Sequence, residues 1–153
     1  MSSRPADRPA SPPTLLDLDV YLLSRVGKAG RAAVAARLAE YGLRLWHMAV
    51  LAVLRDFGPQ DQRSLGERLA LHPSDVAKVV DALARDGRVR RERTPADRRR
   101  VTVDLTEHGR ELLTSLHREA AAVGDRLLSA LTPGERETLR GLLRRVTPPP
   151  GTP

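Results

Sequence analysis

The chain has 153 residues, 41% of them hydrophobic and 29% charged, which is enough to bury the core of one ordinary domain and excludes a disordered chain. Its formal net charge of +7 favours a polyanionic partner, and the absence of cysteine excludes disulfides, thiolate zinc sites and cysteine-based redox sensing. The longest nearly apolar stretch, residues 45–54, is too short to span a membrane, and the N-terminus lacks the apolar core of a signal peptide. We therefore expect a cytoplasmic protein without membrane contact.

Two proline-rich tails frame the chain. Eight of the twelve prolines lie before residue 14 or after residue 147, which predicts flexible tails over residues 1–13 and 147–153. Each of the other prolines falls where one element is expected to give way to the next: Pro59, Pro73, Pro95 and Pro133.

Apolar residues at helical spacing predict two helices in the first part of the chain. The first, within residues 14–42, runs to about Tyr41 and is ended by Gly42. Its opening turns carry an apolar stripe made of Leu15, Leu18, Leu22 and Val26. The second helix, residues 45–57, is almost wholly apolar and is therefore expected to be buried.

Two shorter helices joined by a tight turn are predicted next. Asp61 is placed to cap a third helix that carries Leu65 and Leu69. Pro73 suits the first turn of a fourth helix, which Gly87 ends. The apolar face of this fourth helix should point inward and consists of Val76, Val79, Val80 and Leu83.

The pattern changes to the period of a half-buried strand within residues 89–105. Val101, Val103 and Leu105 alternate with polar residues, and residues 94–97 have the composition of a turn. A β-hairpin is therefore predicted here.

Two leucine-rich helices complete the predicted fold. Thr106 caps the fifth helix, and Thr132, Pro133 and Glu135 form a capping box with proline at the start of the last one. Their apolar stripes are Leu112, Leu116, Ala120, Val123, Leu127 and Leu131 on the fifth helix and Leu139, Leu142, Leu143 and Val146 on the last.

Two short helices followed by a hairpin form a winged helix-turn-helix, whose second short helix fits the major groove of DNA. Its outward face carries Ser74, Asp75, Lys78, Asp81 and Arg85. We expect Ser74 to bond a base or a phosphate, Lys78 to reach guanine or phosphate, and Asp75 to accept a hydrogen bond from cytosine. The simpler alternative is that this face is only the solvated side of an amphipathic helix.

The hairpin is crowded with arginine. Seven arginines lie within residues 88–100, opposed there only by Glu92 and Asp97, so seven positive charges less two negative give +5 of the total of +7. Such crowding costs stability through self-repulsion, whereas DNA phosphates would neutralise it; a merely solvated surface is the alternative. The arginines are Arg88, Arg90, Arg91, Arg93, Arg98, Arg99 and Arg100. The predicted DNA contacts of the hairpin are Arg91, Arg93, Asp97, Arg98, Arg99 and Arg100.

The order of the elements and the hairpin motif together resemble the MarR family of transcriptional regulators. Asp97-Arg98-Arg99, five further residues and then Leu105-Thr106 are similar to the D-x-R-x5-L-T wing signature of that family. Gly87-Arg88-Val89-Arg90-Arg91 resembles the Gly-Leu-Val-x-Arg that precedes this signature, and Gly109 fits the glycine that follows it. The resemblance extends over about residues 43–115.

The resemblance implies roles for particular residues and also shows two departures. Arg99 would enter the minor groove at the tip of the wing, and Asp97 would hold an arginine in position, either Arg99 or Arg91. Arg88 stands where the family usually has an apolar residue. Arg44 stands where the family has a helix-capping Thr or Ser, which leaves the start of the second helix without an obvious cap.

The outer helices imply a second chain. The first, fifth and sixth helices carry more leucine than a small winged domain can cover, and an apolar stripe must be buried somewhere. A two-fold homodimer, which the family resemblance also implies, would bury these stripes and set two recognition helices about 34 Å apart. The predicted interface consists of Leu15, Leu18, Leu22, Leu127, Leu131, Leu139, Leu142, Leu143 and Val146.

The predicted fold is therefore mainly α with a small β-hairpin wing (α+β). A winged helix-turn-helix DNA-binding lobe over residues 43–106 lies between an N-terminal dimerisation helix in residues 14–42 and C-terminal dimerisation helices over residues 107–146. The predicted function is a dimeric repressor of transcription that binds palindromic operator sites in double-stranded DNA. The alternative is a non-specific architectural DNA-binding protein without a ligand, against which Asp75 and Asp81 argue, because carboxylates weaken indiscriminate phosphate binding.

The resemblance further implies that a small aromatic or phenolic acid releases the DNA. Tyr21, Trp46 and His47 would line its pocket; the alternative places Trp46 in the core and the tyrosines at the dimer seam. His108 and His117 are too far apart in sequence to share one helical face, so no metal site is expected. The chain has no phosphate-binding loop or nucleophile motif, so we predict neither an enzyme nor a cofactor.

Overall fold

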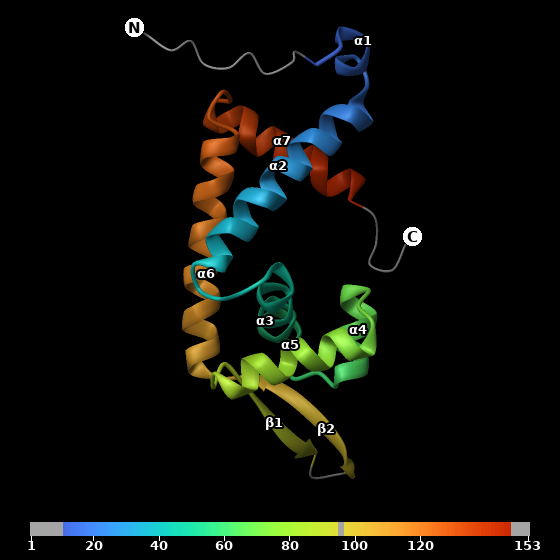
Figure 1. The fold of residues 1–153 in the computed structure, drawn as a ribbon, viewed down its shortest axis with the longest axis vertical. Helices are drawn as coiled ribbons and strands as arrows, with labels where there is room; N and C mark the ends of the chain where they lie inside the picture. The colour runs from blue at the N-terminus through green and yellow to red at the C-terminus, as the bar shows by residue number, and fades with distance from the viewer. Residues whose placement is uncertain (1–10, 95–96, 148–153) are drawn as a thin grey trace, which may run out of the picture.

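The computed structural model describes residues 11–94 and 97–147, which are mainly helical with one antiparallel hairpin (Figure 1). The elements in chain order are α1 (Pro13–Leu16), α2 (Asp19–Ala39), α3 (Leu45–Phe57), α4 (Gln62–Leu69), α5 (Pro73–Arg85), β1 (Val89–Thr94), β2 (Asp97–Leu105), α6 (Glu107–Leu127) and α7 (Pro133–Val146). The predicted winged helix-turn-helix, with helices on both sides of it in the sequence, is confirmed.

Figure 1 shows two groups of elements connected by α6. At one end of the molecule, α2 and α7 lie near the C-terminal part of α6. At the other end, α3, α4 and α5 form a lobe from which the hairpin projects. The 21 residues of α6 run along one side of the molecule and pass both groups.

The core lies where α3, α5, the hairpin and the first half of α6 meet. Trp46 and Phe57, at the two ends of α3, are 39% and 58% exposed, so the expectation that this apolar helix is wholly buried is wrong at its ends. Elsewhere the inward faces match the predicted periodicity except at Val101, which is 40% exposed, whereas Val103 and Leu105 on the same strand are buried. The buried side chains of these elements are Val50, Leu51, Val53, Leu54, Val76, Val79, Val80, Leu83, Val89, Val103, Leu105, Leu112, Leu113 and Leu116.

The single first helix predicted within residues 14–42 is wrong, because the chain forms two helices there. Leu18 has an extended backbone (φ −100°, ψ 115°), and its carbonyl accepts the N–H of Leu22 at 3.1 Å, so a new helix begins after it. The short α1 buries no residue, and therefore no packing holds it in line with α2. At its other end α2 stops at Ala39, and Gly42 supplies the positive φ of 68° that the following turn requires.

Three predicted helix caps are present. Asp61 Oδ1 accepts a backbone N–H from the first turn of α4 at 2.8 Å, and Thr106 Oγ1 accepts the Gly109 N–H of α6 at 3.1 Å. At α7, Thr132 Oγ1 accepts the Glu135 N–H at 3.3 Å while the Glu135 carboxylate accepts the Thr132 N–H at 2.7 Å. These local signals therefore fix the starts of three helices.

The strand β2 of the hairpin is hydrogen-bonded on both of its edges. Its register is regular from the root to the Arg93–Val101 pair. Gln60, in the connection between α3 and α4, exchanges two backbone hydrogen bonds of 3.0 and 2.7 Å with Val103. The strand β2 is thus held by β1 on one side and by the start of the helix-turn-helix on the other.

Gly109 provides a test of how tightly α6 packs on the root of the hairpin. We expect Gly109→Ala to lower the free energy of unfolding by about 1–3 kcal/mol, because a Cβ there would overlap the Arg88 carbonyl oxygen and come within 2.8 Å of Leu105 Cδ1. Gly124→Ala, in the same helix with nothing within 4 Å of the new Cβ, should instead raise it by about 0.5–1 kcal/mol. Urea unfolding of both variants measures the difference; equal effects would mean that α6 can shift away from the hairpin.

Candidate nucleic-acid interface

The outward face of α5 is polar because its apolar face is used by the core. All five predicted outward residues are exposed: Ser74, Asp75, Lys78, Asp81 and Arg85. Lys78 Nζ lies 3.5 Å from Asp75 Oδ1, and the two side chains are 77% and 54% exposed. Such an exposed pair is weak, so DNA could displace it. The predicted orientation of the helix is confirmed, and contact with DNA remains a prediction.

His72 caps the N-terminus of α5. Its Nδ1 accepts the Ser74 N–H at 3.3 Å and lies 2.8 Å from Ser74 Oγ. An imidazole nitrogen can accept a hydrogen bond only when it is unprotonated. This cap is not predicted from the sequence, because the residues preferred at this position are Ser, Thr, Asp and Asn. His72 therefore holds the hydroxyl of Ser74, a predicted DNA contact.

Carboxylates from outside residues 88–100 also approach the hairpin arginines, which the count within that stretch leaves out. Within the hairpin, Arg90 pairs with both Glu92 and Asp104, and two further pairs join the hairpin to α5 and to the start of α4. The pairs are Arg90–Glu92 at 2.7 Å, Arg90–Asp104 at 2.8 Å, Arg91–Asp81, and Arg100–Asp61 at 3.0 Å. These ion pairs offset the repulsion and orient the arginines, so arginine crowding alone does not require DNA.

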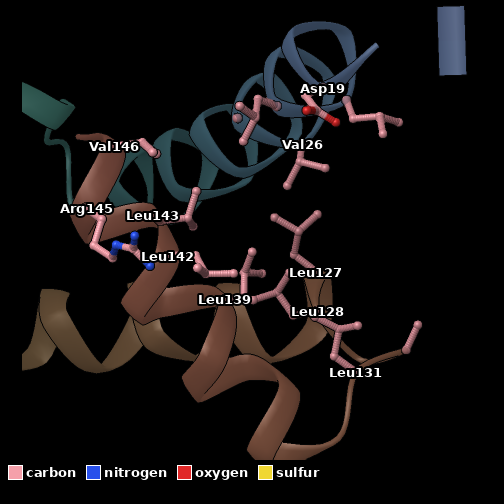
Figure 2. Close-up of a pocket in the computed structure, with 14 residues that line it drawn as sticks. Asp19, Val26, Leu127, Leu128, Leu131, Leu139, Leu142, Leu143, Arg145 and Val146 are labelled. Atoms are coloured by element: carbon pink, nitrogen blue, oxygen red, sulfur yellow. The ribbon is translucent and has the colours of Figure 1, made fainter. Parts of the chain in front are cut away.

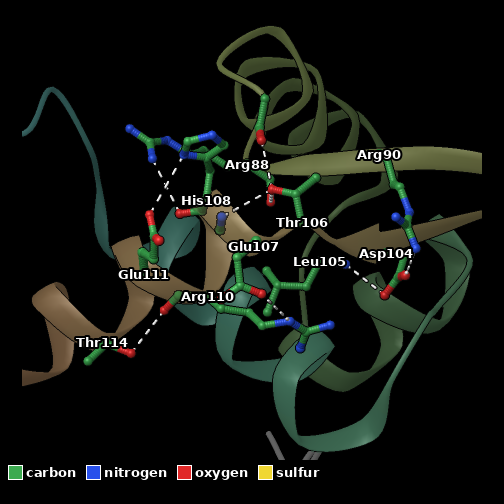
Figure 3. A network of polar contacts seen from close by, with 12 residues as sticks. Arg88, Arg90, Asp104, Leu105, Thr106, Glu107, His108, Arg110, Glu111 and Thr114 are labelled. Atoms are coloured by element: carbon green, nitrogen blue, oxygen red, sulfur yellow. Dashed lines mark hydrogen bonds and ion pairs between the residues drawn. The ribbon is translucent and has the colours of Figure 1, made fainter.

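Polar contacts fix the root of the hairpin to α6 (Figure 3). Thr106 Oγ1 donates to the Gly87 carbonyl at 2.7 Å while it caps α6. The Arg88 guanidinium donates to the His108 carbonyl at 3.3 Å. Arg88, which stands in place of an apolar residue, thus connects the residue just before β1 to the first turn of α6.

The tip of the hairpin is only partly described. The side chains of Arg98 and Arg99 lie outside the described residues, so the entry of Arg99 into the minor groove and its orientation by Asp97 stay predictions. Arg91, the other arginine considered as a partner of Asp97, lies against Asp81. The exposed side chains that the structure describes toward the tip are Arg93, Asp97 and Arg100.

α3 begins with a cap that the sequence analysis missed. The Arg44 N–H donates to His47 Nδ1 at 3.0 Å, so His47 plays the part of the Glu or Gln in a capping box, while Arg44 supplies no side-chain acceptor in place of the Thr or Ser. This hydrogen bond needs a neutral imidazole. Burial lowers the pKa of His47 below its ordinary value of 6.5 and so favours that form.

A hollow of about 430 Å³ lies between the start of α3 and α5. Trp46 and His47, two of the residues predicted to line a ligand pocket, both line it, and Trp46 is too exposed to be a core residue. Tyr21 is not part of it: this side chain lies in the first turn of α2, where the Arg25 guanidinium is 5.8 Å from the centre of its ring. The hollow is lined by Arg44, Trp46, His47, Asp75, Lys78 and Val79.

The other end of the molecule carries an open apolar groove of about 880 Å³ between α2, α6 and α7 (Figure 2). Leu15 and Leu18 of the predicted dimer interface are not among its lining residues, and Leu18 is 52% exposed. The other predicted interface residues all line it: Leu22, Leu127, Leu131, Leu139, Leu142, Leu143 and Val146. Nothing among the described residues of the single chain covers this apolar surface.

Within residues 11–94 and 97–147, no group of three or more His, Asp or Glu side chains is arranged to hold a metal ion. Nor is any helix there long and apolar enough to cross a membrane. His108 Nδ1 lies 3.7 Å from Glu111 on the same helix, an exposed local pair.

Comparisons with known proteins agree with this geometry. The profile described as the MarR family matches residues 45–101, from the start of α3 into β2. The chain is 37% identical over 106 residues to the HTH-type transcriptional regulator YkoM of Bacillus subtilis, covering 69% of each protein. It is 28% identical over 145 residues to the HTH-type transcriptional repressor NicR of Pseudomonas putida, covering 95% of this chain and 90% of NicR.

A solved structure has the same fold. The crystal structure of CouR from Rhodococcus jostii, bound to p-coumaroyl-CoA, has a TM-score of 0.69 and 29% sequence identity. The likeness covers 88% of this chain and 95% of CouR. The named relatives regulate transcription, which is a non-enzymatic role.

The cap on α3 predicts a pH effect. Because the folded protein lowers the pKa of His47, its contribution to stability is fully present above the unfolded value of about 6.5 and is lost as the pH falls through the folded value. We expect the imidazole NMR signals of His47 to titrate with a midpoint below 6.5. His47→Gln keeps a side-chain acceptor but does not titrate, so it should lose less unfolding free energy than the wild type between about pH 7.5 and pH 5. A midpoint at or above 6.5 would contradict the buried, neutral cap.

Proposed function

Since the chain belongs to the MarR family of winged helix-turn-helix regulators, we propose that it is a homodimeric repressor that binds palindromic operator DNA in the cytoplasm. The observation that carries this proposal is that the outward face of α5 and the arginine-rich hairpin lie together at one end of the molecule (Figure 1). A helix beside a basic hairpin suits a major groove and the adjacent minor groove.

In this arrangement α5 and the hairpin have different tasks. The first half of α5 brings Ser74, Asp75 and Lys78 to the base edges, and Arg85 at its other end reaches a phosphate. The outer hairpin, with Arg93 and residues 97–100, follows the minor groove and the phosphates beside it. Contacts to bases supply sequence preference, whereas contacts to phosphates supply affinity that depends on salt.

The groove between α2, α6 and α7 is the proposed dimer interface. Exposed apolar side chains gather there, including Leu142 and Leu143, which are 50% and 38% exposed in the single chain. A two-fold axis through this groove would bury them and give the operator its palindromic form. NicR, which is named a repressor, supports the direction of the regulatory effect.

The proposed effector is a small aromatic acid bound in the hollow between α3 and α5. Arg44 and Lys78 supply positive charge for a carboxylate, and Trp46 supplies ring surface. Lys78 and Asp75 belong both to the hollow and to the outward face of α5, so a ligand there would compete with DNA for the same side chains. The p-coumaroyl-CoA held by CouR supports a regulator that responds to a ligand.

Lys78→Ala tests the recognition helix. The DNA is a duplex that the wild-type protein enriches from a random-sequence library, and fluorescence anisotropy compares it with a scrambled duplex over a range of salt concentrations. We expect the variant to lose about 1–3 kcal/mol of binding free energy on the enriched duplex, because Lys78 reaches a base. Lys28→Ala removes the same charge from α2 and should have little effect.

The other outcomes of this measurement are equally informative. An equal loss on both duplexes would make Lys78 a phosphate contact. If the wild-type protein bound both duplexes equally at every salt concentration, operator recognition would be refuted and the architectural alternative would stand.

Leu142→Asp tests the dimer. A carboxylate in the apolar groove cannot be buried without a partner, so the variant should become monomeric in analytical ultracentrifugation at micromolar concentration. Gly141→Asp adds the same charge at the neighbouring position, which is exposed and outside the groove, and should leave the dimer intact. An unchanged mass for Leu142→Asp would refute this placement of the interface.

A further inference from the structure

The outer half of the hairpin lacks regular strand pairing. The register passes directly from Arg93–Val101 to Thr94–Asp97, so residues 98–100 of β2 have no Cα partner among the described residues of β1. Extra residues of this kind bend a strand and re-aim its side chains. Pairing with β1 therefore does not fix the direction of the outer hairpin, and another contact is needed to do so.

Asp61 supplies such a contact from the start of α4. Its Oδ1 accepts the Ser64 N–H at 2.8 Å and caps the helix, while its Oδ2 accepts a hydrogen bond from Arg100 Nη2 at 3.0 Å. The Asp61 side chain is 22% exposed, whereas that of Arg100 is 66% exposed. Hydrogen bonds from Ser64, and a further one from Arg100, lower the pKa of Asp61 to about 2, so this carboxylate is charged at neutral pH.

The residue before Asp61 holds the same strand. Gln60 and Val103 exchange two backbone hydrogen bonds of 3.0 and 2.7 Å, and Val103 is completely buried. Residues 60–61 thus hold β2 at two points, through the backbone near its root and through Arg100 about 10 Å further along the strand. The inner point is part of the core, whereas the outer point includes the ion pair between Arg100 and Asp61.

We propose that Asp61 is a positioning residue for DNA recognition, which holds Arg100, and with it the outer hairpin, at a fixed angle to the helix-turn-helix. This inference rests on the proposed DNA-binding function. An exposed ion pair contributes little to folding stability, so the role proposed for the Asp61–Arg100 pair is to fix a direction. α5 and the hairpin must meet two grooves at the same time, and the angle between them decides where both fit.

The competing interpretation is that Asp61 only shields Arg100 until DNA arrives. The two interpretations predict opposite effects when Asp61 is neutralised. If Asp61 is a shield, the loss of a negative charge beside DNA tightens binding to every duplex and steepens the salt dependence. If Asp61 is a positioning residue, the enriched duplex binds more weakly even though the protein has lost a negative charge.

The experiment compares Asp61→Asn with Glu67→Gln in the full-length protein. Asparagine caps helices about as well as aspartate, so α4 stays capped. Glu67 lies on the same helix and pairs with Arg63 at 2.8 Å, so its neutralisation is a matched charge control away from the hairpin. Binding to the enriched duplex and to a scrambled duplex is measured over a range of salt concentrations, and thermal unfolding checks that each variant folds.

We expect Asp61→Asn to bind the enriched duplex about tenfold more weakly, with an unchanged salt slope and unchanged or higher affinity for the scrambled duplex. Glu67→Gln should weaken neither interaction. Arg100→Gln, which leaves the cap intact, should show the same loss on the enriched duplex, and the double variant should be no weaker than Arg100→Gln alone, because the two residues act as one unit.

Unchanged or tighter binding of the enriched duplex by Asp61→Asn, an equal loss on both duplexes, or additive losses in the double variant would overturn the proposal. If Asp61→Asn does not fold, the binding of the two duplexes by Arg100→Gln is the measurement that tests the proposal. A loss confined to the enriched duplex supports positioning, and an equal loss with a salt slope lower by about one identifies a phosphate contact and overturns it. A wild-type protein that enriches no duplex refutes the proposed function itself, and this inference with it.

Discussion

Burial of one face of α5 is the constraint on which the DNA-binding end depends. The helix cannot rotate about its axis without exposing aliphatic side chains, and each fully exposed side chain would cost about 1.5–3 kcal/mol. The direction of the polar face is therefore determined by the packing of the apolar face in the core and not by the polar residues themselves. Because the hairpin begins four residues after α5 ends, the same packing fixes where the wing starts. The buried residues of α5 are Val76, Val79, Val80 and Leu83.

The charge of the hairpin is balanced by the helices beside it. Asp81 of α5 forms an ion pair with Arg91, and Asp61 at the start of α4 forms one with Arg100. These carboxylates therefore join the hairpin to the two helices of the helix-turn-helix. The backbone bridge between Gln60 and Val103 holds the root of the hairpin, and these ion pairs add contacts further along it. In the proposed function, such pairs would set the angle between the hairpin and α5 before DNA binds.

Local signals predicted much of this fold, and long-range pairings could not be predicted. The bounds of α3 and the caps at Asp61 and Thr106 follow from periodicity and from neighbouring residues, and the structure has them where the sequence places them. Asp61 and Arg100, in contrast, are 39 residues apart and meet only because β2 folds back onto the start of α4. The cap formed by His47 was missed for another reason: histidine is not a usual capping residue, and burial is what keeps this one neutral.

α6 connects the two surfaces on which the proposed function depends. Its first turn packs on the root of the hairpin through Gly109, and its last residue, Leu127, lines the apolar groove. A helix of this length is stiff and spans about 30 Å, so a rotation of about 5° at the groove would move the hairpin end by about 3 Å. In the proposed dimer the direction in which α6 leaves the interface therefore sets the distance between the two hairpins. In this proposed dimer, the outer helices determine the spacing of the operator half-sites. The choice of bases is determined by α5 and by the angle of the wing.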